Sequence, residues 1–313
     1  MSTLYDRKIE LTVSPAKATS GIDLSVFRIR FQILQSTIET PNSADIRVYN
    51  VAESTAALFT GKGEFSRVRL SGGYQGNSSL LFDGTIVQTR AGRESPVDTF
   101  VDITAADGDI AYNSAYVNGS LVAGATTKDH LDLVMRSMKQ YDIQLGHAPT
   151  LTDKVSPRGR AIFGMARDQL RDIAQSNDSS WSIQNGKVVI LPNGQALPGT
   201  AVILNSETGL LGLPQQTQLG IIARTLINPL IKVGALVKID QKSVQRIRID
   251  PSYMGVGQVA KLPHVAQDGL YRVLVADHFG DTRGNDWFTE CICIALGTPI
   301  TQGLIPRGVA ITP

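Results

Sequence analysis

Two pairs of residues in this sequence have the types and spacing that acid–base chemistry uses. Asp107 and Asp109 could act as the paired carboxylates of a polysaccharide-acting enzyme. His278 and Asp281 could act as a general base and the group that orients it. Each pair lies at the end of a predicted strand in a glycine-containing turn, where aspartate is common because its side chain bonds the local backbone. A turn role is therefore the favoured interpretation of both pairs.

Residues that could bind a metal, a phosphate or a redox partner do not form a recognisable site. The histidines are scattered through the chain, at His130, His147, His264 and His278. Cys291 and Cys293 are separated by one residue, a spacing that suits neither a disulfide nor a zinc knuckle. Residues 255–258 lack the following helix that a phosphate cradle needs. We expect no catalytic residue, no cofactor and no metal.

Length and composition set broad limits on the function. The chain has 313 residues, more than one domain usually holds, so two or three domains are expected. Lys and Arg number 30 against 28 Asp and Glu, a net charge of +2, which predicts no specific nucleic-acid binding. The start of the chain lacks an apolar signal core, and no run approaches ~18 apolar residues, so we expect no membrane span. The cysteines are interpreted as buried thiols, which indicates a reducing compartment.

Alternating patterns fill both ends of the chain. Apolar residues at Phe27, Ile29 and Phe31 alternate with polar ones, which is typical of a strand with one buried face. Similar short strands, separated by glycine and proline turns, extend over residues 1–110 and again over residues 199–298. Many short strands with regular turns favour a sandwich or a barrel. We therefore expect two β-domains with the same strand topology.

Between these two blocks, residues 111–198 change period. Apolar residues recur at helical spacing over residues 131–141 and again over residues 162–174, which predicts two amphipathic helices. Asn185 and Gly186 are the signature of a two-residue hairpin. These patterns predict a small inserted α+β domain. Residues 299–313 are expected to form an extended arm.

A group of arginines lies on the polar side of the predicted strands of the first block. They are Arg28, Arg30, Arg47, Arg67 and Arg69. Because they alternate with apolar residues, they could share one face of a sheet. That face is either a solvated surface or a docking surface or channel lining, since arginine is favoured at interfaces. Acidic residues nearby, Asp45 and Glu64, weaken any case for nucleic-acid binding.

Three stretches of sequence, taken in order, resemble one family. They are residues 41–51 (PNSADIRVYNV), followed by a predicted short helix, residues 81–86 (LFDGTI) and residues 269–289. These stretches are similar to the baseplate hub proteins of contractile-tail phages, including late-control-D-type tail proteins, and to the hub part of type VI secretion spikes. The resemblance covers most of the chain at the level of domain order.

The resemblance implies a mainly β protein in which two tube-type β-barrel domains bracket an inserted α+β domain. The boundaries would be 1–110, 111–198 and 199–298. It also implies a homotrimer, in which six barrels match a hexameric tail tube on one side and meet a central spike on the other, among other baseplate proteins. Such a protein would be synthesised and assembled in the bacterial host cytoplasm and would reside in the tail baseplate of the virion.

Three alternatives remain open at this point. The chain could be the hub of a phage-derived contractile particle, a tailocin, which the sequence does not separate from a phage hub. It could be a β-rich polysaccharide-acting enzyme that uses Asp107 or Asp109. It could also be a monomeric carbohydrate-binding module, which a stable trimer would contradict.

Overall fold

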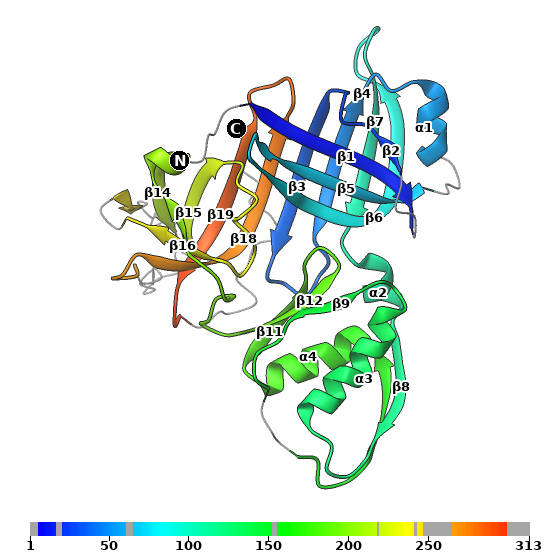
Figure 1. Cartoon of the computed structure of the whole chain (residues 1–313), viewed down its shortest axis with the longest axis vertical. Coiled ribbons are helices and arrows are strands. Elements are labelled where there is room, and N and C mark those ends of the chain that lie inside the picture. The colour runs from blue at the N-terminus through cyan, green and yellow to red at the C-terminus, as the bar shows by residue number, and fades with distance from the viewer. Residues whose placement is uncertain are drawn as a thin grey trace, which may run out of the picture.

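A computed structural model describes residues 6–16, 21–60, 65–151, 155–217, 219–240, 243–246 and 265–298. Most strands join one 14-stranded sheet, and two small sheets belong to an inserted domain at one end of the molecule (Figure 1). The predicted mainly β class with a small α+β insertion is confirmed. Three predictions lie outside the described residues: the turn at 255–258, His264 and the arm at 299–313.

The first block is a strongly bent sheet. Its elements are β1 (Arg7–Pro15), β2 (Ile22–Asp23), β3 (Ile29–Ser36), β4 (Ser43–Tyr49), α1 (Glu53–Thr60), β5 (Phe65–Tyr74), β6 (Asn77–Arg93) and β7 (Thr99–Ala106). The long strand β6 pairs with β5 over its first half and with β7 over its second half. It therefore carries the sheet around a core, into which β1 and β5 point from one side and β3 and β4 from the other.

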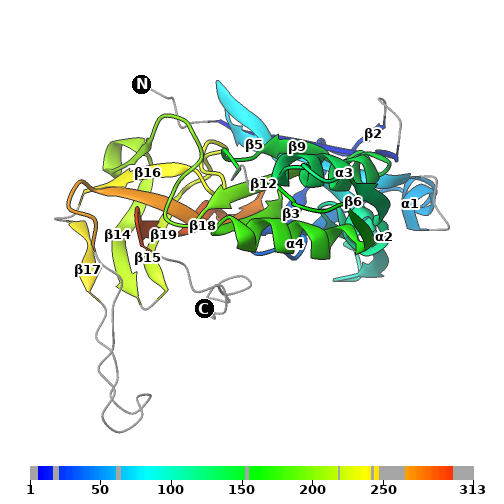
Figure 2. The same cartoon turned by 90° about the horizontal axis from the view of Figure 1, so that it is seen from below.

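The inserted domain has its own core. Its elements are α2 (Asp109–Ser114), β8 (Tyr116–Leu121), α3 (Thr127–Lys139), β9 (Gln144–His147), β10 (Arg160–Met165), α4 (Ala166–Ser176), β11 (Ser179–Ile183) and β12 (Lys187–Pro192). The first predicted helix is confirmed, as is the hairpin, whose turn residues Asn185 and Gly186 both have positive φ. In Figure 1 the domain lies below the first block, at the ends of its strands, and in Figure 2, seen from below, it lies in front of that block.

The second predicted helix begins later than the sequence pattern indicates. Residues 160–165 form strand β10 instead, and the helix starts at Ala166. Ile162 is buried because β10 pairs with β8 and turns this side chain toward the helices. A single buried residue at that position satisfies a helical and a strand pattern equally well, which explains the error.

The second block repeats the β architecture. Its elements are β13 (Val202–Leu204), the short helix η1 (Ser206–Thr208), β14 (Leu210–Thr217), β15 (Gly220–Leu226), β16 (Leu236–Ile239), β17 (Gln245–Arg246), β18 (Leu270–Asp281) and β19 (Trp287–Ala295). Cys291 and Cys293 are free thiols in its core, as their alternation predicts.

The two blocks share one strand order. Neighbouring strands run β1-β5-β6-β7-β4-β3 in the first block and β13-β16-β18-β19-β15-β14 in the second. When the six strands of each block are numbered along the chain, both blocks have the same lateral order, 1-4-5-6-3-2. The predicted common topology is therefore confirmed at the level of strand order. One pairing differs in direction, since β1 and β5 are antiparallel whereas β13 and β16 are parallel. Among the described residues the ladder is an open path from β17 to β2, so closure into barrels stays a prediction.

The blocks are joined edge to edge by β18 and β3. These strands pair antiparallel over seven positions, from Val275 opposite Ser36 to Asp281 opposite Arg30. Beneath the joint, the buried ring of Phe31 meets Trp287 edge-on, with 5.8 Å between ring centroids. The joint is thus both a backbone ladder and a packed core contact.

The turn between β18 and β19 is also fastened to the first block. Thr282 and Ile29 exchange two hydrogen bonds: the Thr282 N–H donates to the Ile29 carbonyl at 2.9 Å, and the Ile29 N–H donates to Thr282 Oγ1 at 3.0 Å. Arg7 of β1 donates from Nη1 to the carbonyl oxygen of Gly284 at 2.7 Å and lies over the Trp287 ring. The two blocks therefore form one continuous unit.

Candidate interface surfaces

One outward face of the large sheet carries most of the organised charge. It runs across β15, β19, β18, β3, β4, β7 and β6, and we call it the polar face, although over β15, β18 and β19 it also carries a small buried apolar cluster that includes Ile292 and Ile294. Its side chains alternate with those of the two cores. Over the first block it holds a hollow of about 470 Å³, lined among others by Arg30, Asp45, Arg47, Arg90 and Asp102.

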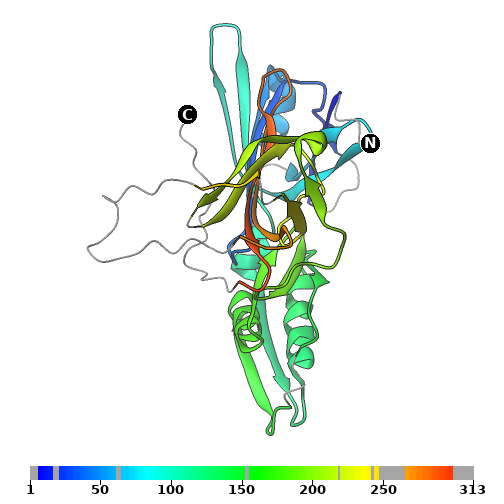
Figure 3. The same cartoon turned by 90° about the vertical axis from the view of Figure 1, so that its left-hand side faces the viewer.

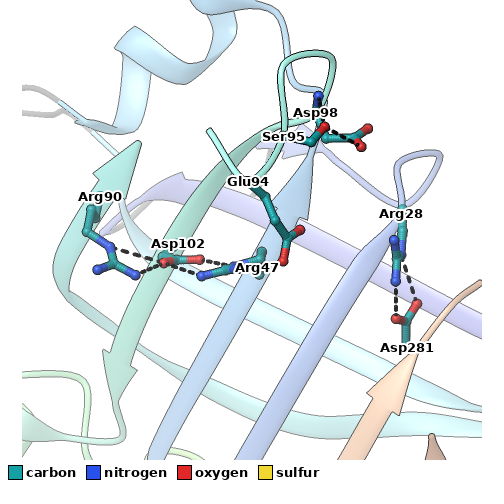
Figure 4. Close-up of polar contacts among 8 residues, drawn as sticks. All are labelled: Arg28, Arg47, Arg90, Glu94, Ser95, Asp98, Asp102 and Asp281. Carbon is teal, nitrogen blue, oxygen red and sulfur yellow. Dashed lines mark hydrogen bonds and ion pairs between the residues drawn. The ribbon is translucent and has the colours of Figure 1, made fainter. Parts of the chain in front are cut away.

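A cluster of ion pairs fixes the polar face of the first block (Figure 4). The Asp102 carboxylate accepts hydrogen bonds from Nε and Nη2 of Arg47 at 2.7 and 3.1 Å. It also accepts from Nη2 of Arg90 at 2.5 Å. Burial opposes ionisation of Asp102, but these arginines hold its pKa below the ordinary value. The Arg47 guanidinium lies 4.0 Å from the centroid of the Phe100 ring, so it is held from two directions.

The second block repeats this arrangement at the corresponding positions. The β6–β7 hairpin is closed by a bond from the Glu94 N–H to the Asp98 carbonyl, and the β18–β19 hairpin by one from the Asp281 N–H to the Asp286 carbonyl. Counting four residues on from Asp98 and from Asp286 gives Asp102 and Glu290 as corresponding residues.

The partners of Glu290 correspond as well. Nε and Nη2 of Arg224 donate to Glu290 Oε2 at 3.2 and 3.0 Å, and Arg224 lies 4.5 Å from the centroid of the Phe288 ring. Arg224 pairs with Glu290 across β15 and β19 as Arg47 pairs with Asp102 across β4 and β7. We call the two sets the first cluster (Arg47, Phe100, Asp102) and the second cluster (Arg224, Phe288, Glu290).

The five arginines singled out by the sequence fall into two groups on different surfaces. Arg28, Arg30 and Arg47 belong to the polar face. Arg67 and Arg69 of β5 point away from the core on its other side, where both bond Asp83, at 2.7 and 3.0 Å. All five side chains point away from the core, but they face different sides of it, because β6 bends the sheet around the core between β5 and β4.

Arg28, just before β3, and Arg30, within it, also differ from each other. Arg28 makes a two-point ion pair with Asp281 across the joint between the blocks, at 3.2 and 2.6 Å (Figure 4). The hydrogen bond from Arg28 holds the pKa of Asp281 below its ordinary value. Arg30 is exposed and has no partner among the described residues.

The inserted domain is attached through a buried carboxylate. Both oxygens of Asp107 accept backbone N–H bonds from the hairpin turn, from Asn185 and from Gly186, the latter at 2.8 Å. The Asp83 N–H donates in turn to Asn185 Oδ1 at 3.1 Å. Burial raises the pKa of Asp107 to about 7, although the two N–H bonds oppose this shift. The hairpin tip is thus clamped to the end of the first block.

The family of the chain follows from comparison with known proteins. The profile of the baseplate hub gp41 family matches residues 25–245, which is more than half of the 313 residues. The chain belongs to this family. The protein is therefore a structural hub component of a phage tail baseplate, which confirms the resemblance drawn from the sequence. A search of curated proteins found no match.

Solved structures show the same fold as this hub at low sequence identity. The 43 kDa tail protein of prophage MuSo2 from Shewanella oneidensis is 10% identical with a TM-score of 0.56, and 93% of this chain covers 98% of that one. A tail protein from Neisseria meningitidis MC58 is 11% identical with a TM-score of 0.56, at 92% and 96% coverage. The E. coli c3393 protein, a component of the type VI secretion system, is 11% identical with a TM-score of 0.52, at 95% and 80% coverage.

The residues that suggested acid–base chemistry have structural partners in the hub. Asp107 is committed to the hairpin turn, and Asp109 accepts a bond from Asn113 within α2. His278 is buried against Thr289, and burial lowers its pKa to about 4, whereas Asp281 bonds Arg28. In the part of the chain that the structure describes, no group of His, Cys, Asp and Glu could hold a metal ion, and no helix is long and apolar enough to span a membrane.

Sequence reasoning missed both carboxylates of the clusters, Asp102 and Glu290. A signal was present, because an aromatic residue precedes each by two positions, in Phe100-x-Asp102 and Phe288-x-Glu290. Each pair lies on a predicted strand, so its members share one face. Only the repeated strand order, however, shows that the two pairs occupy corresponding places.

Proposed function

We propose that three copies of this hub form a ring that joins the hexameric tail tube to the central spike. The repeated strand order carries the proposal, because a chain with two similar blocks presents two similar surfaces. Three such chains offer six similar blocks, which fits a six-fold partner on one side and a three-fold partner on the other. Other baseplate proteins would bind the outer surface of the ring.

The role inferred here is structural and not enzymatic. Asp107 was a candidate catalytic carboxylate of a polysaccharide-acting enzyme. Both of its oxygens accept hydrogen bonds from the backbone of the hairpin turn, so neither is free to act on a substrate. In each cluster of the polar face an arginine is paired with a carboxylate and lies over an aromatic ring, which suits a surface that keeps its shape. We infer synthesis and assembly in the host cytoplasm, before incorporation into the virion.

The mass of the assembled chain tests the proposal. The purified protein should have the mass of three chains at micromolar concentration, alone or after addition of the spike protein, and images should show a ring. A parallel measurement with the tail tube protein should show binding to one end of that ring. A chain that stays monomeric alone and with both partners contradicts the trimeric hub.

A further inference from the structure

One arginine of the second block is completely buried. Arg272 of β18 lies opposite Leu236 of β16 and Ile294 of β19, and it is 1% exposed. Its Nη1 donates to the carbonyl oxygens of Pro192 and Gln195, at 3.1 and 2.6 Å. Its other two nitrogens, Nε and Nη2, are shielded from solvent and have no hydrogen-bond partner among the described residues. A fully buried arginine is rare unless it is paired.

The charge of Arg272 has no counter-charge in the described part of the chain. Burial lowers the pKa of Arg272 to about 10, and no carboxylate opposes this shift. Arg47, Arg67 and Arg224 are all more exposed than Arg272, yet each of them forms an ion pair with a carboxylate. A buried charge without a partner costs far more free energy than a partly exposed one. The most deeply buried of these four cations is therefore the one that lacks an anion.

The unpartnered edge of Arg272 is the edge that binds carboxylates elsewhere in this chain. Nε and Nη2 of an arginine point the same way and together match the two oxygens of a carboxylate. In Arg67 they donate to the two oxygens of Asp83, at 2.7 Å each. The same two atoms form the ion pairs Arg28–Asp281, Arg47–Asp102 and Arg224–Glu290. The ligand chemistry that fits this edge is thus a planar carboxylate.

The position of Arg272 shows what such a ligand would affect. Arg272 holds the turn at residues 192–195, which leads from β12 of the inserted domain to the second block. In the same turn the Gly194 carbonyl accepts a bond from the N–H of Gly297, just after β19, at 2.9 Å. Figure 3 shows the inserted domain, in green, below the sheet that the two blocks form. This turn is therefore a second attachment of the inserted domain, in addition to the Asp107 clamp.

We propose that the Nε–Nη2 edge of Arg272 binds a carboxylate from outside the chain. Its source is a small free acid or an Asp or Glu side chain of another baseplate protein, since both present the same two oxygens. Because the two nitrogens are shielded, the ligand reaches them only when the turn at residues 192–195 shifts. Binding neutralises a buried charge, so it stabilises the hub and fixes the second attachment of the inserted domain.

Acetate is the probe for the free acid. The full-length hub is unfolded by heat while sodium acetate replaces sodium chloride at constant ionic strength and pH. The midpoint of the wild type should rise with acetate, because a ligand that binds only the folded state stabilises it. Arg272→Lys keeps the charge but lacks the planar edge, so it should weaken acetate binding about tenfold or more. Arg158→Lys is the matched control, since Arg158 is exposed, and it should respond like the wild type.

Arg272→Met is a second variant, for the case that lysine does not fit the buried site. Methionine is unbranched and adapts to irregular space, and it carries no charge. The midpoint of this variant should not respond to acetate beyond the response that all the variants share. Circular dichroism in chloride alone verifies that each variant is folded.

Assembly tests the other source of the carboxylate. Each variant is produced together with the remaining tail proteins, and the yield of particles is measured. A loss of particles for folded Arg272→Lys and Arg272→Met but not for Arg158→Lys, with no acetate response in the wild type, assigns the carboxylate to another baseplate protein. An acetate response that both Arg272 variants lose assigns the edge to a free acid. If both variants follow the wild type in acetate and in particle yield, the carboxylate site is wrong and the hub role stands.

Discussion

The first and second clusters place the same kinds of side chain on the same backbone positions but balance their charges differently. Asp102 is partly exposed and bonds two arginines. Glu290 is 2% exposed and accepts hydrogen bonds from Arg224 at one oxygen, whereas its other oxygen, Oε1, has no hydrogen-bond partner among the described residues. The position that Arg90 fills opposite Asp102 is filled by Asp277 opposite Glu290. In both clusters an arginine lies over an aromatic ring and bonds a carboxylate. The sheet keeps this arrangement although the neighbouring position carries Arg90 in one cluster and Asp277 in the other.

The largest expected effect lies at the joint where the two blocks meet. Phe31→Ala removes a buried ring that contacts Trp287 of the other block, and it should lower the free energy of unfolding by roughly 3–5 kcal/mol. Phe163→Ala is the control, because that ring is 69% exposed, and it should cost less than ~1 kcal/mol. Urea unfolding followed by tryptophan fluorescence compares them. Equal losses would show that the joint is not a shared core.

The clamp on the inserted domain should give the next largest effect. Asp107→Asn places an amide NH2 against a backbone N–H that needs an acceptor, so it should cost about 1–3 kcal/mol at pH 5. Because burial raises the pKa of Asp107 to about 7, the wild type loses stability as pH rises from the unfolded value near ~4 through 7. Asp107→Asn has no ionisable group at this position, so its free energy of unfolding lacks this dependence on pH.

The gap in unfolding free energy between wild type and Asp107→Asn should therefore narrow from pH 5 to pH 8. Urea titrations at both pH values measure it. A gap that widens with pH would mean that the N–H bonds outweigh burial and that the pKa of Asp107 is lowered instead.

The clusters themselves should respond unequally. Asp102→Asn weakens charge-assisted bonds to two arginines and should cost about 1–2 kcal/mol. Glu290→Gln should cost less than ~1 kcal/mol, because it removes a buried charge of which one oxygen is unpaired within the described part of the chain, while Arg224 keeps an oxygen to bond. Thermal unfolding at pH 7 ranks the two variants. A larger loss for Glu290→Gln would contradict the view that the second cluster is the less well satisfied one.

The smallest effects separate two neighbouring arginines. Arg28→Glu sets two carboxylates against each other at Asp281 and should cost on the order of 1 kcal/mol, since Arg28 is partly exposed and water screens the contact. Arg30→Glu should change stability by no more than ~0.5 kcal/mol, because Arg30 has no partner among the described residues.

Assembly gives a second readout for the same two variants. Replacing Arg28 and Arg30 together with Glu should impair trimer or tube assembly if the polar face contacts a neighbour. Particle yield for the double variant and for each single variant shows which of the two arginines assembly requires. Normal particles from all three would assign this surface to solvent alone.

The sequence predicted what depends on local patterns. The alternation of Phe27, Ile29 and Phe31 indicated a strand, and Asn185–Gly186 indicated the hairpin, because side-chain period and turn chemistry are local. It did not predict that Arg67 leaves the face that Arg47 occupies. That separation depends on where the long strand β6 changes partner, which no residue pattern within β5 or β4 encodes.

The candidate site was predictable only in part, for the same reason. Arg28, Arg30 and Arg47 were found from their alternation, but their partners Asp281 and Asp102 come from distant strands. Pairing between β3 and β18 depends on which edges remain free after each block has formed, and that is a property of the whole sheet. The correspondence of Asp102 with Glu290 became visible only through the repeated strand order.

The joint between β3 and β18 also sets the timing of folding. The ion pair across it links Arg28 to Asp281, which are 253 residues apart. At ~5–20 residues per second, synthesis leaves β3 without its neighbour for roughly 10–50 seconds. During that interval the edge of the first block is open to any passing strand, so newly made chains are most vulnerable to misassociation before the β18–β19 hairpin emerges. Emergence of β18, and not folding of the first block, ends that exposure.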